Sequence, residues 1–270
     1  MKLVIAHGWD TGLHRDLNED SYLIWQSDSP AELNGESLPL TGLASSETAD
    51  APLGLVVIAD GIGGAAAGEV ASKLALETVA QEIVRSAAKA SWDAVIRRAV
   101  ARADDALRAA RQAAGNAMGT TLVGALLAGT TAYVVNVGDS RAYRVTGQDI
   151  HRITHDHSYV QYLVDSHQIS EQEVRTHPQR NIITRSLGEK GHTQIDLFPI
   201  ALIANQTLLL CTDGLWEMVE DDEIQEIVTT APDLAHAAKS LVARANAHGG
   251  ADNISVILVQ MSEMAFQSNP

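Results

Sequence analysis

The stretch that most constrains the fold runs from residue 53 to residue 68, LGLVVIADGIGGAAAG. It begins with uncharged, largely β-branched residues, which are typical of a buried strand, and from Ala66 onward the pattern is typical of a helix. Asp60 stands where the apolar run stops, and Gly61 opens a glycine-rich turn that lets the backbone approach a ligand closely. We therefore expect a strand that ends at Asp60, at the edge of a sheet.

Two other interpretations of this stretch have to be weighed. Asp-Gly is common in tight turns, so a purely structural turn stays open on these residues alone. Gly61, Gly63 and Ala66 also fit the G-x-G-x-x-A pattern of a dinucleotide site, with Glu82 roughly twenty residues further on. The chain lacks a regular alternation of strands and helices, and Asp60 would put a negative charge beside the pyrophosphate. No G-K-S/T follows, which excludes a P-loop.

Composition limits the class of protein and its partners. The chain has 270 residues, 46% apolar and 20% charged, which indicates a single soluble domain, residues 1–270. Its 34 acidic and 19 basic residues give a net charge of −15, which disfavours nucleic acid and anionic membranes as partners. No apolar run approaches the roughly eighteen residues of a membrane span, and the N-terminus has no signal pattern, so we expect a cytoplasmic protein.

Cys211 is the only cysteine and lies in the apolar run LLLC. Disulfides within the chain are therefore impossible, and a buried structural thiol is expected. Glu217 stands six residues further on, where a Cys-x5-Arg phosphatase nucleophile would require arginine.

The hydrophobic periodicity predicts an alternation of strand and helix groups. Strands are expected at 2–7, 22–25, 119–127, 131–137, 141–145, 195–200, 207–211 and 254–260, with the three between 119 and 145 forming an antiparallel meander. Long amphipathic helices are expected at 66–88 and 91–114, and shorter ones at 159–164, after Ser170, at 221–229 and after Pro232, with that proline in the first turn.

Two segments fall outside this pattern. Residues 26–52 are rich in Ser, Pro, Gly, Asp and Glu, and we interpret them as a long exposed hairpin loop with a composition typical of disorder. Residues 155–192 predict a small helical flap, in which the capping box of Ser170 and Glu173 opens one helix. The spacing of the flap histidines fits no metal site, so they are expected to be surface or structural residues: His155, His157, His167 and His177.

Acidic residues stand at the ends of the predicted strands. Asp60, Asp139 and Asp213 each close an apolar strand, and Asp252 opens one. In an antiparallel sheet these positions share an edge, so the four side chains can converge. Glu19 and Asp20 lie at the start of another strand, after a loop that carries Arg15, and would join them. Such a cluster repels itself by several kcal/mol unless cations are bound.

The donors in this cluster select the kind of metal. All are oxygens, which favours Mg²⁺ or Mn²⁺ over Zn²⁺, and this many carboxylates would suit two ions about 3.5–4 Å apart. A water between the ions would lose a proton near neutral pH and become a nucleophile. Arg15 would hold a phosphoryl group over the ions. The predicted reaction is in-line hydrolysis of a phosphate monoester.

Seven short motifs, taken together and in order, resemble one family. They are R-D-L-N-E-D-S at 15–21, D-G-I-G-G at 60–64, M-G-T-T at 118–121, G-D-S-R at 138–141, D-H-S at 156–158, T-D-G-L-W at 212–216 and G-G-A-D-N-I-S at 249–255. The set resembles the metal-dependent Ser/Thr protein phosphatases (PPM, or type 2C) in their bacterial stand-alone form. Each motif alone is weak, but the ordered set spans nearly the whole chain.

The resemblance implies an α+β fold, an αββα sandwich of two antiparallel sheets with helices outside, and a binuclear Mn²⁺/Mg²⁺ centre. Residue roles follow by motif: Asp60 would bridge the ions, the Gly61 carbonyl would bind one of them, and Asp213 and Asp252 would complete the first ion's shell. Glu19 and Asp20 would act on or near the second ion, mostly through water, and Asp139 with Asp213 would hold a third ion. Arg15 would bind phosphate. Asp60, Asp213 and Arg15 would therefore carry the catalysis.

The resemblance also implies partners and leaves gaps. The expected substrates are Ser/Thr-phosphorylated proteins, including a cognate Ser/Thr kinase, and we expect a monomer. Ile62 and Ala65 stand where family members often carry a histidine, so no general acid is assigned. A non-catalytic module that binds phosphoproteins or metal is the competing class, and a hydrolase of small phosphate esters is a third possibility.

Overall fold

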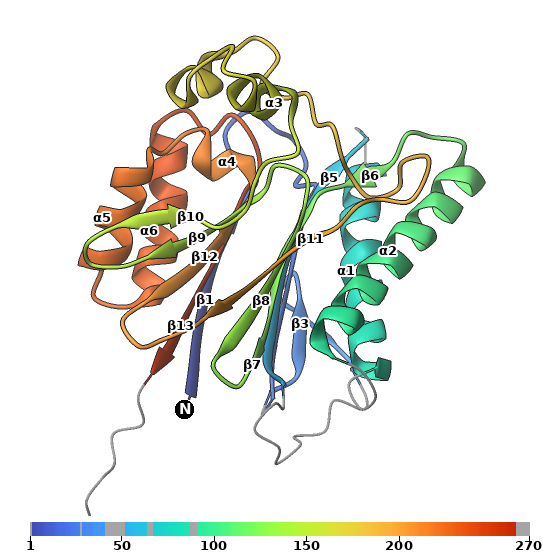
Figure 1. Ribbon diagram of the computed structural model, residues 1–270, viewed down its shortest axis with the longest axis horizontal. Helices are drawn as coiled ribbons and strands as arrows, with labels where there is room; N and C mark the ends of the chain where they lie inside the picture. Colours follow the sequence, from blue (N-terminus) through green and yellow to red (C-terminus); the bar gives the residue numbers. More distant parts are fainter. Residues whose placement is uncertain (1, 28, 41–51, 64–66, 87–90, 263–270) are drawn as a thin grey trace, which may run out of the picture.

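Two antiparallel β-sheets lie face to face, with helices on both outer faces (Figure 1). The computed structural model describes residues 1–270 except 1, 28, 41–51, 64–66, 87–90 and 263–270. One sheet has five strands, in the order β1 (Lys2–Asp10), β13 (Ile254–Ser262), β12 (Thr207–Cys211), β9 (Arg141–Val145) and β10 (Ile150–Arg152). The other has eight, in the order β11 (Asp196–Ala201), β8 (Thr131–Val137), β7 (Leu122–Ala128), β5 (Pro52–Ile62), β2 (Asp20–Gln26), β3 (Ala31–Leu33) and β4 (Glu36–Leu38), with β6 (Gly119–Thr120) beside β5.

The helices cover the outer faces as the sequence predicted. α1 (Ala67–Ser86) and α2 (Trp92–Ala114) pack against the eight-stranded sheet. α5 (Asp221–Thr230), α6 (Leu234–Ala247) and the short α4 (Asp213–Trp216) pack against the five-stranded sheet. The predicted αββα sandwich is confirmed.

The period-two alternation of the strands builds three apolar layers. On β5, Val56 and Ile58 face the other sheet, while Leu55 and Val57 face α1 and α2. On β12 the same alternation turns Cys211 toward the helices, where it is fully buried and burial raises the pKa of its thiol. The expectation of a buried structural thiol is confirmed.

Several predicted boundaries are wrong. β5 continues for two residues beyond Asp60, because Gly61 and Ile62 pair with β6. β9 does not extend a meander with β7 and β8. It belongs to the five-stranded sheet, because the turn at Gly138, with φ 110°, carries the chain across from one sheet to the other. Pro232 precedes the N-cap of α6 and lies outside its first turn.

The segment 26–52 is more ordered than predicted. β3 and β4 form a hairpin that extends the eight-stranded sheet, and Ala31 and Leu33 are buried in the core. Asn34 and Gly35, both with positive φ, make the two-residue turn. Asn-Gly between short apolar stretches is a strong hairpin signal that the composition of the segment concealed. Residues 41–51 of the predicted loop lie outside the described residues.

The helical part of the predicted flap, residues 159–176, covers one end of the sandwich, at the top of Figure 1. It contains α3 (Tyr159–Asp165) and the 3-10 helix η1 (Glu171–Thr176), which the predicted capping box of Ser170 and Glu173 opens. Arg175 of η1 donates to the carbonyls of Trp216 and Val219, at 2.7 and 3.2 Å. This contact ties the flap to the layer of α4 and α5.

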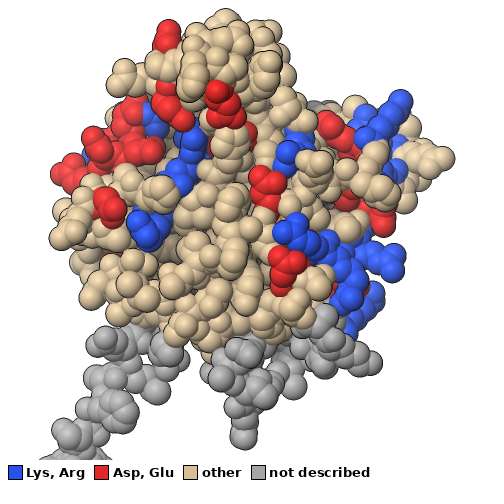
Figure 2. All heavy atoms as spheres, viewed as in Figure 1, with Lys and Arg blue, Asp and Glu red and all other residues tan. Residues whose placement is uncertain are grey.

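Charge is unevenly spread over the visible face. Acidic side chains gather over α5 on the left of Figure 2, and arginines gather over α2 on the right. None of the helices in the described part of the chain is both long enough and apolar enough to span a bilayer.

Candidate metal centre

The site begins with the register of β2 on β5. Asp20 lies directly opposite Asp60, and each continues the inward-facing alternation of its strand, after Tyr22 and Ile58 respectively. Like charges placed opposite each other destabilise a sheet. Two carboxyl groups therefore face the interior at the end of the sandwich that lies under the flap.

A cavity of about 230 Å³ opens at this end. Every predicted site residue except Asp20 lines it: Arg15, Glu19, Asp60, Gly61, Asp139, Asp213 and Asp252. Ile62, Gly63, Asn181, Ile183 and Asn253 complete the lining. Residues from both sheets and from the flap thus meet in one cleft, as the strand-end pattern predicted.

Asp20 lies beneath the cleft and is only 1% exposed. Its Oδ2 accepts hydrogen bonds from the hydroxyls of Thr212 at 2.9 Å and Ser255 at 2.7 Å. Its Oδ1 is buried and has no hydrogen-bond partner within the described structure. Burial raises the pKa of this carboxyl to about 7, against the opposing effect of the two hydroxyls.

Asp60 is held through its backbone by the M-G-T-T motif. Its N–H donates to Thr121 Oγ1 at 3.0 Å, and its carbonyl accepts from Thr120 Oγ1 at 2.8 Å and from the Thr121 N–H at 2.9 Å. The side chain of Asp60 takes no part in these bonds, and Asp60 lines the cleft. Burial, followed by the charges of Asp20 and Asp213, raises the pKa of the Asp60 carboxyl well above its ordinary value.

Asp213 and Asp139 approach from the five-stranded side and from the turn between the sheets. Asp213 opens α4 directly after β12, and Asp139 follows Gly138. Each has a buried Oδ1 to which no described residue donates a hydrogen bond. Burial and the neighbouring Asp139 raise the pKa of Asp213 well above its ordinary value, and burial and Asp156 raise the pKa of Asp139 to about 7.

Arg15 and Asp252 form an ion pair at the mouth of the cleft, with Nη2 and Oδ2 2.6 Å apart. The Arg15 side chain is 49% exposed. The hydrogen bond to Asp252 raises the pKa of the guanidinium. Asn253 fixes the loop that carries Arg15, because its Nδ2 donates to the Leu17 carbonyl at 2.9 Å and its Oδ1 accepts from the Glu19 N–H at 2.8 Å.

Glu19 and Gly61 meet the first turn of α1. Glu19 Oε1 accepts a hydrogen bond from the Gly68 N–H at 3.2 Å, so this carboxylate already has a partner at a helix N-terminus. A Cβ on Gly61 would lie 2.2 Å from the Gly68 carbonyl oxygen, so only glycine fits there. The close packing leaves the Gly61 backbone on the wall of the cleft.

The chemistry of these residues fits a divalent metal. In the part of the chain that the structure describes, three buried carboxylate oxygens lack partners, on Asp20, Asp139 and Asp213. The pKa values of these carboxyls are raised by burial and by their neighbours, and all the donors are oxygens, as Mn²⁺ and Mg²⁺ prefer. Within the described ranges, however, no three acidic, histidine or cysteine side chains are close enough to hold an ion as they stand. Apart from Asp20, these carboxylates nevertheless line one cavity.

The residues that hold these carboxylates and the Arg15 loop in place were not among the predicted site residues. Thr121, Thr212, Ser255 and Asn253 all lie inside the quoted motifs, so their positions were visible although their hydrogen bonds were not. Asn181 of the flap reaches the cleft without any signal in the local pattern.

Comparisons with known proteins show the family of the chain. The family model for Protein phosphatase 2C matches residues 43–255. The serine/threonine phosphatase stp of Listeria monocytogenes is 36% identical over 211 residues, which make up 76% of this chain and 84% of that protein. The crystal structure of the serine/threonine phosphatase Stp1 from Staphylococcus aureus matches with a TM-score of 0.81 at 32% identity, over 97% of this chain and 96% of that one.

A further solved structure bears on the metal. The catalytic domain of the serine threonine protein phosphatase PstP, in complex with 2 manganese ions, matches with a TM-score of 0.76 at 30% identity, over 97% of this chain and 99% of that one. The motifs, the sandwich and these likenesses agree with one another. The chain therefore belongs to the protein phosphatase 2C family and is a serine/threonine protein phosphatase.

Proposed function

We propose that the chain hydrolyses phosphoserine and phosphothreonine in proteins at a binuclear Mn²⁺ or Mg²⁺ centre in the carboxylate cleft. The observation that carries this proposal is the group of buried carboxylate oxygens, unpartnered among the described residues, around one cavity with an arginine at its mouth. In water-free surroundings such a group is stable only if it is protonated or neutralised by cations.

The proposed ligands divide between the two sheets. From the eight-stranded side, Asp60 would bridge the two ions and the Gly61 carbonyl would bind one of them; from the five-stranded side, Asp213 and Asp252 would complete the first ion's shell. Glu19 and Asp20 would act near the second ion, mostly through water, which suits the partners that both already have. Asp139, with Asp213, would hold a third ion. When bound, the ions would neutralise the carboxylates, act as Lewis acids toward phosphoryl oxygens and lower the pKa of water.

Arg15 would bind the phosphoryl group of the substrate. Its side chain is half exposed at the mouth of the cleft, and its fork can donate to two phosphoryl oxygens. In the reaction, the oxygen of water forms a bond to phosphorus while the bond from phosphorus to the Ser or Thr oxygen breaks in line with it. Arg15 is placed to stabilise the charge that develops on the phosphoryl oxygens.

The mouth of the cleft suits a protein substrate. The lining of the cleft includes the flap residues Asn181 and Ile183, and Arg15 at its mouth is half exposed, so a phosphorylated side chain could enter from solvent. Substrates of this kind are made by Ser/Thr kinases, and we include a cognate kinase among the proposed substrates. We also propose that the enzyme is a cytoplasmic monomer.

The test is turnover of a phosphothreonine peptide with Mn²⁺, with and without EDTA. Wild type should be active with Mn²⁺ and inactive with EDTA, and Asp60→Asn should lose at least about a thousandfold in kcat while remaining folded. Asp105→Asn, an exposed aspartate on α2, is the matched control and should behave as wild type. Equal turnover by Asp60→Asn and wild type would rule the centre out. Specificity constants for peptides against small phosphate esters decide between the substrate classes.

A further inference from the structure

The D-H-S motif, Asp156–Ser158, has no place in the cleft, although all three residues are buried. Ser158 has an evident role as the N-cap of α3, where its Oγ accepts from the Gln161 N–H at 3.3 Å. Burying a histidine and an aspartate in the other two positions costs free energy unless their polar atoms are satisfied. Their partners lie on the turn that carries Asp139.

His157 and Gly138 form two hydrogen bonds with each other. The Gly138 N–H donates to His157 Nδ1 at 3.0 Å, and the His157 N–H donates to the Gly138 carbonyl at 2.9 Å. His157 therefore contacts both peptide groups of Gly138, the second of which leads directly into Asp139; Asn136 Nδ2 adds a longer bond to the same carbonyl, at 3.3 Å. His157 is 6% exposed, so water competes little for these bonds.

The imidazole is itself held from its far side. Because Nδ1 accepts a hydrogen bond, the neutral ring carries its proton on Nε2, which faces Asp196 Oδ2 at 3.1 Å. Arg185 Nη1 lies 2.8 Å from the same Nε2 and donates to Asp196 Oδ1 at 3.0 Å. The ring orientation is thus fixed by the Asp196 carboxylate, which Arg185 holds in turn, since a guanidinium cannot donate to an Nε2 that carries a proton.

The position of Asp139 depends on its backbone. Its Oδ1 has no hydrogen-bond partner among the residues described, so this oxygen is not held by a neighbour. Gly138 has φ 110°, a conformation that is strained for other residues, and a Cβ there would lie 2.6 Å from Thr121 Cβ. A turn of this kind keeps its shape only when surrounding contacts determine it.

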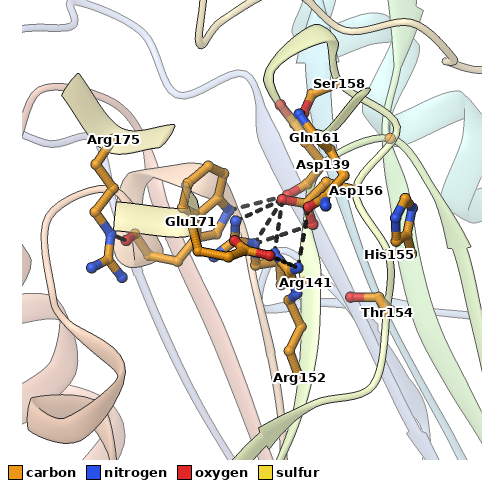
Figure 3. A network of polar contacts seen from close by, with 12 residues as sticks. Asp139, Arg141, Arg152, Thr154, His155, Asp156, Ser158, Gln161, Glu171 and Arg175 are labelled. Carbon is orange, nitrogen blue, oxygen red and sulfur yellow. Dashed lines mark hydrogen bonds and ion pairs between the residues drawn. The ribbon is translucent and has the colours of Figure 1, made fainter. Parts of the chain in front are cut away.

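A second brace reaches Asp139 from the same motif, as Figure 3 shows. Asp156 accepts hydrogen bonds from Arg141, among them Nε to Oδ2 at 2.9 Å and Nη2 to Oδ2 at 2.6 Å. The Arg141 guanidinium lies 3.5 Å above the Trp216 ring, and Trp216 Nε1 donates to the Asp139 carbonyl at 3.0 Å. Asp139 is therefore bordered by held peptide groups on both sides.

We propose that His157 is a positioning residue for Asp139: by clamping the Gly138 peptides it directs the Asp139 carboxylate into the cleft, so that its loss weakens the binding of the ion that Asp139 holds. This inference rests on the proposed function, because it assumes that Asp139 is a metal ligand. It predicts an effect on the binding of the third ion, which Asp139 would share with Asp213, and none on the two ions of the proposed binuclear centre.

The test is calorimetric titration of the metal-free full chain with Mn²⁺, with Asp139→Asn as the reference. His157→Ala should weaken the same binding step that Asp139→Asn weakens, by about 10- to 100-fold, and leave the other steps at wild-type affinity. His157→Asn should recover most of the affinity, because its side-chain oxygen can take the place of Nδ1. His155→Ala is the matched control, an exposed histidine two residues away, and should titrate as wild type.

A second variant tests the inference if His157→Ala does not fold. Asp196→Asn keeps the ring and removes its carboxylate partner, so it should cause a smaller loss in the same step. Unchanged titration of Asp196→Asn would then overturn the inference, as would equal weakening of every step in His157→Ala, which would indicate a merely structural role. A wild type that binds no Mn²⁺ would instead overturn the proposed function, and the inference with it.

Discussion

In the proposed function, Arg15 binds the phosphoryl group of the substrate, and in the structure it pairs with Asp252. Its ion pair with Asp252 is partly exposed, and pairs of this kind contribute only about 0–1 kcal/mol. A phosphoryl group can therefore take the guanidinium from Asp252 at small cost. The same exchange would free the Asp252 carboxylate at the mouth of a cleft that is otherwise strongly acidic.

Replacing Arg15 should therefore reduce catalysis without unfolding the protein. We expect Arg15→Ala to lower kcat/KM for a phosphothreonine peptide by about 100- to 1000-fold, as the loss of one charge-stabilising donor does. Arg15→Lys should recover only part of this, because an ammonium lacks the planar fork. Steady-state kinetics measure both. Arg97→Ala, an exposed arginine on α2, is the control, and an Arg15→Ala enzyme with wild-type kinetics would contradict the assignment.

Gly138 should be irreplaceable for a reason unrelated to ligand binding. Its φ of 110°, together with the 2.6 Å that would separate a Cβ at this position from Thr121 Cβ, predicts a strained alanine variant. Gly138→Ala should lower the free energy of unfolding by about 1–3 kcal/mol or more. Gly147→Ala is the matched control, because a Cβ there meets nothing within 4 Å. Urea denaturation measures the difference. Equal stability of the two variants would show that the turn accommodates a side chain.

At the scale of elements, the strands and helices with regular periodicity were predictable and their partners were not. Leu55 to Ile58 alternate in the same way whichever strand lies beside them, so the pattern gives β5 but not the extension to Ile62, which depends on β6. The alternation of residues 141–145 likewise cannot reveal that β9 changes sheet, since one glycine turn decides it.

The candidate site could likewise be predicted only in part. The carboxylates were found from their places at strand ends, because antiparallel strands bring such ends to one edge. The hydroxyls of Thr212 and Ser255 could not be assigned to Asp20, because that contact depends on the register between sheets. The sequence pattern predicted a surface or structural role for His157, but its bond to Gly138 joins residues nineteen apart across the β9–β10 hairpin and could not be predicted.

The flap offers a prediction about a single element. Arg175 holds η1 to the carbonyls of Trp216 and Val219 and is largely buried, so Arg175→Ala should loosen the flap locally. Hydrogen exchange should become faster in residues 159–176 and stay unchanged in β5. Lys190→Ala, exposed near the end of the flap, is the control. Faster exchange throughout the molecule, or none, would contradict a local role.

At the scale of the whole molecule, the same buried carboxyl groups affect both the stability of the fold and the proposed binding of metal. The chain has a net charge of −15, and its acidic residues include buried carboxyls in and beneath the cleft whose pKa values are raised, to about 7 for Asp20 and Asp139. Folded, these groups bind protons more tightly than in the unfolded chain. Their contribution to the stability of the metal-free protein is therefore complete below about pH 4 and is lost as the pH rises through about 7.

Mn²⁺ should accordingly stabilise the protein more at high pH than at low pH, because it competes with protons for these carboxylates. We expect the difference in Tm between Mn²⁺ and EDTA samples to grow from about pH 5 to about pH 8. Thermal unfolding followed by circular dichroism measures it. Asp60→Asn should reduce the difference, and a difference independent of pH would show that the buried carboxyls do not bind the ion.

The two sheets meet through aliphatic side chains such as Ile58, Val123 and Ile257, and the donors of the cleft are divided between those sheets. The width of the cleft is consequently set by the thickness of the aliphatic layer between the sheets, none of whose atoms contacts the substrate. Substituting one aliphatic side chain for another in this layer would therefore change the width of the cleft, and with it the activity, while every polar group of the cleft stays the same.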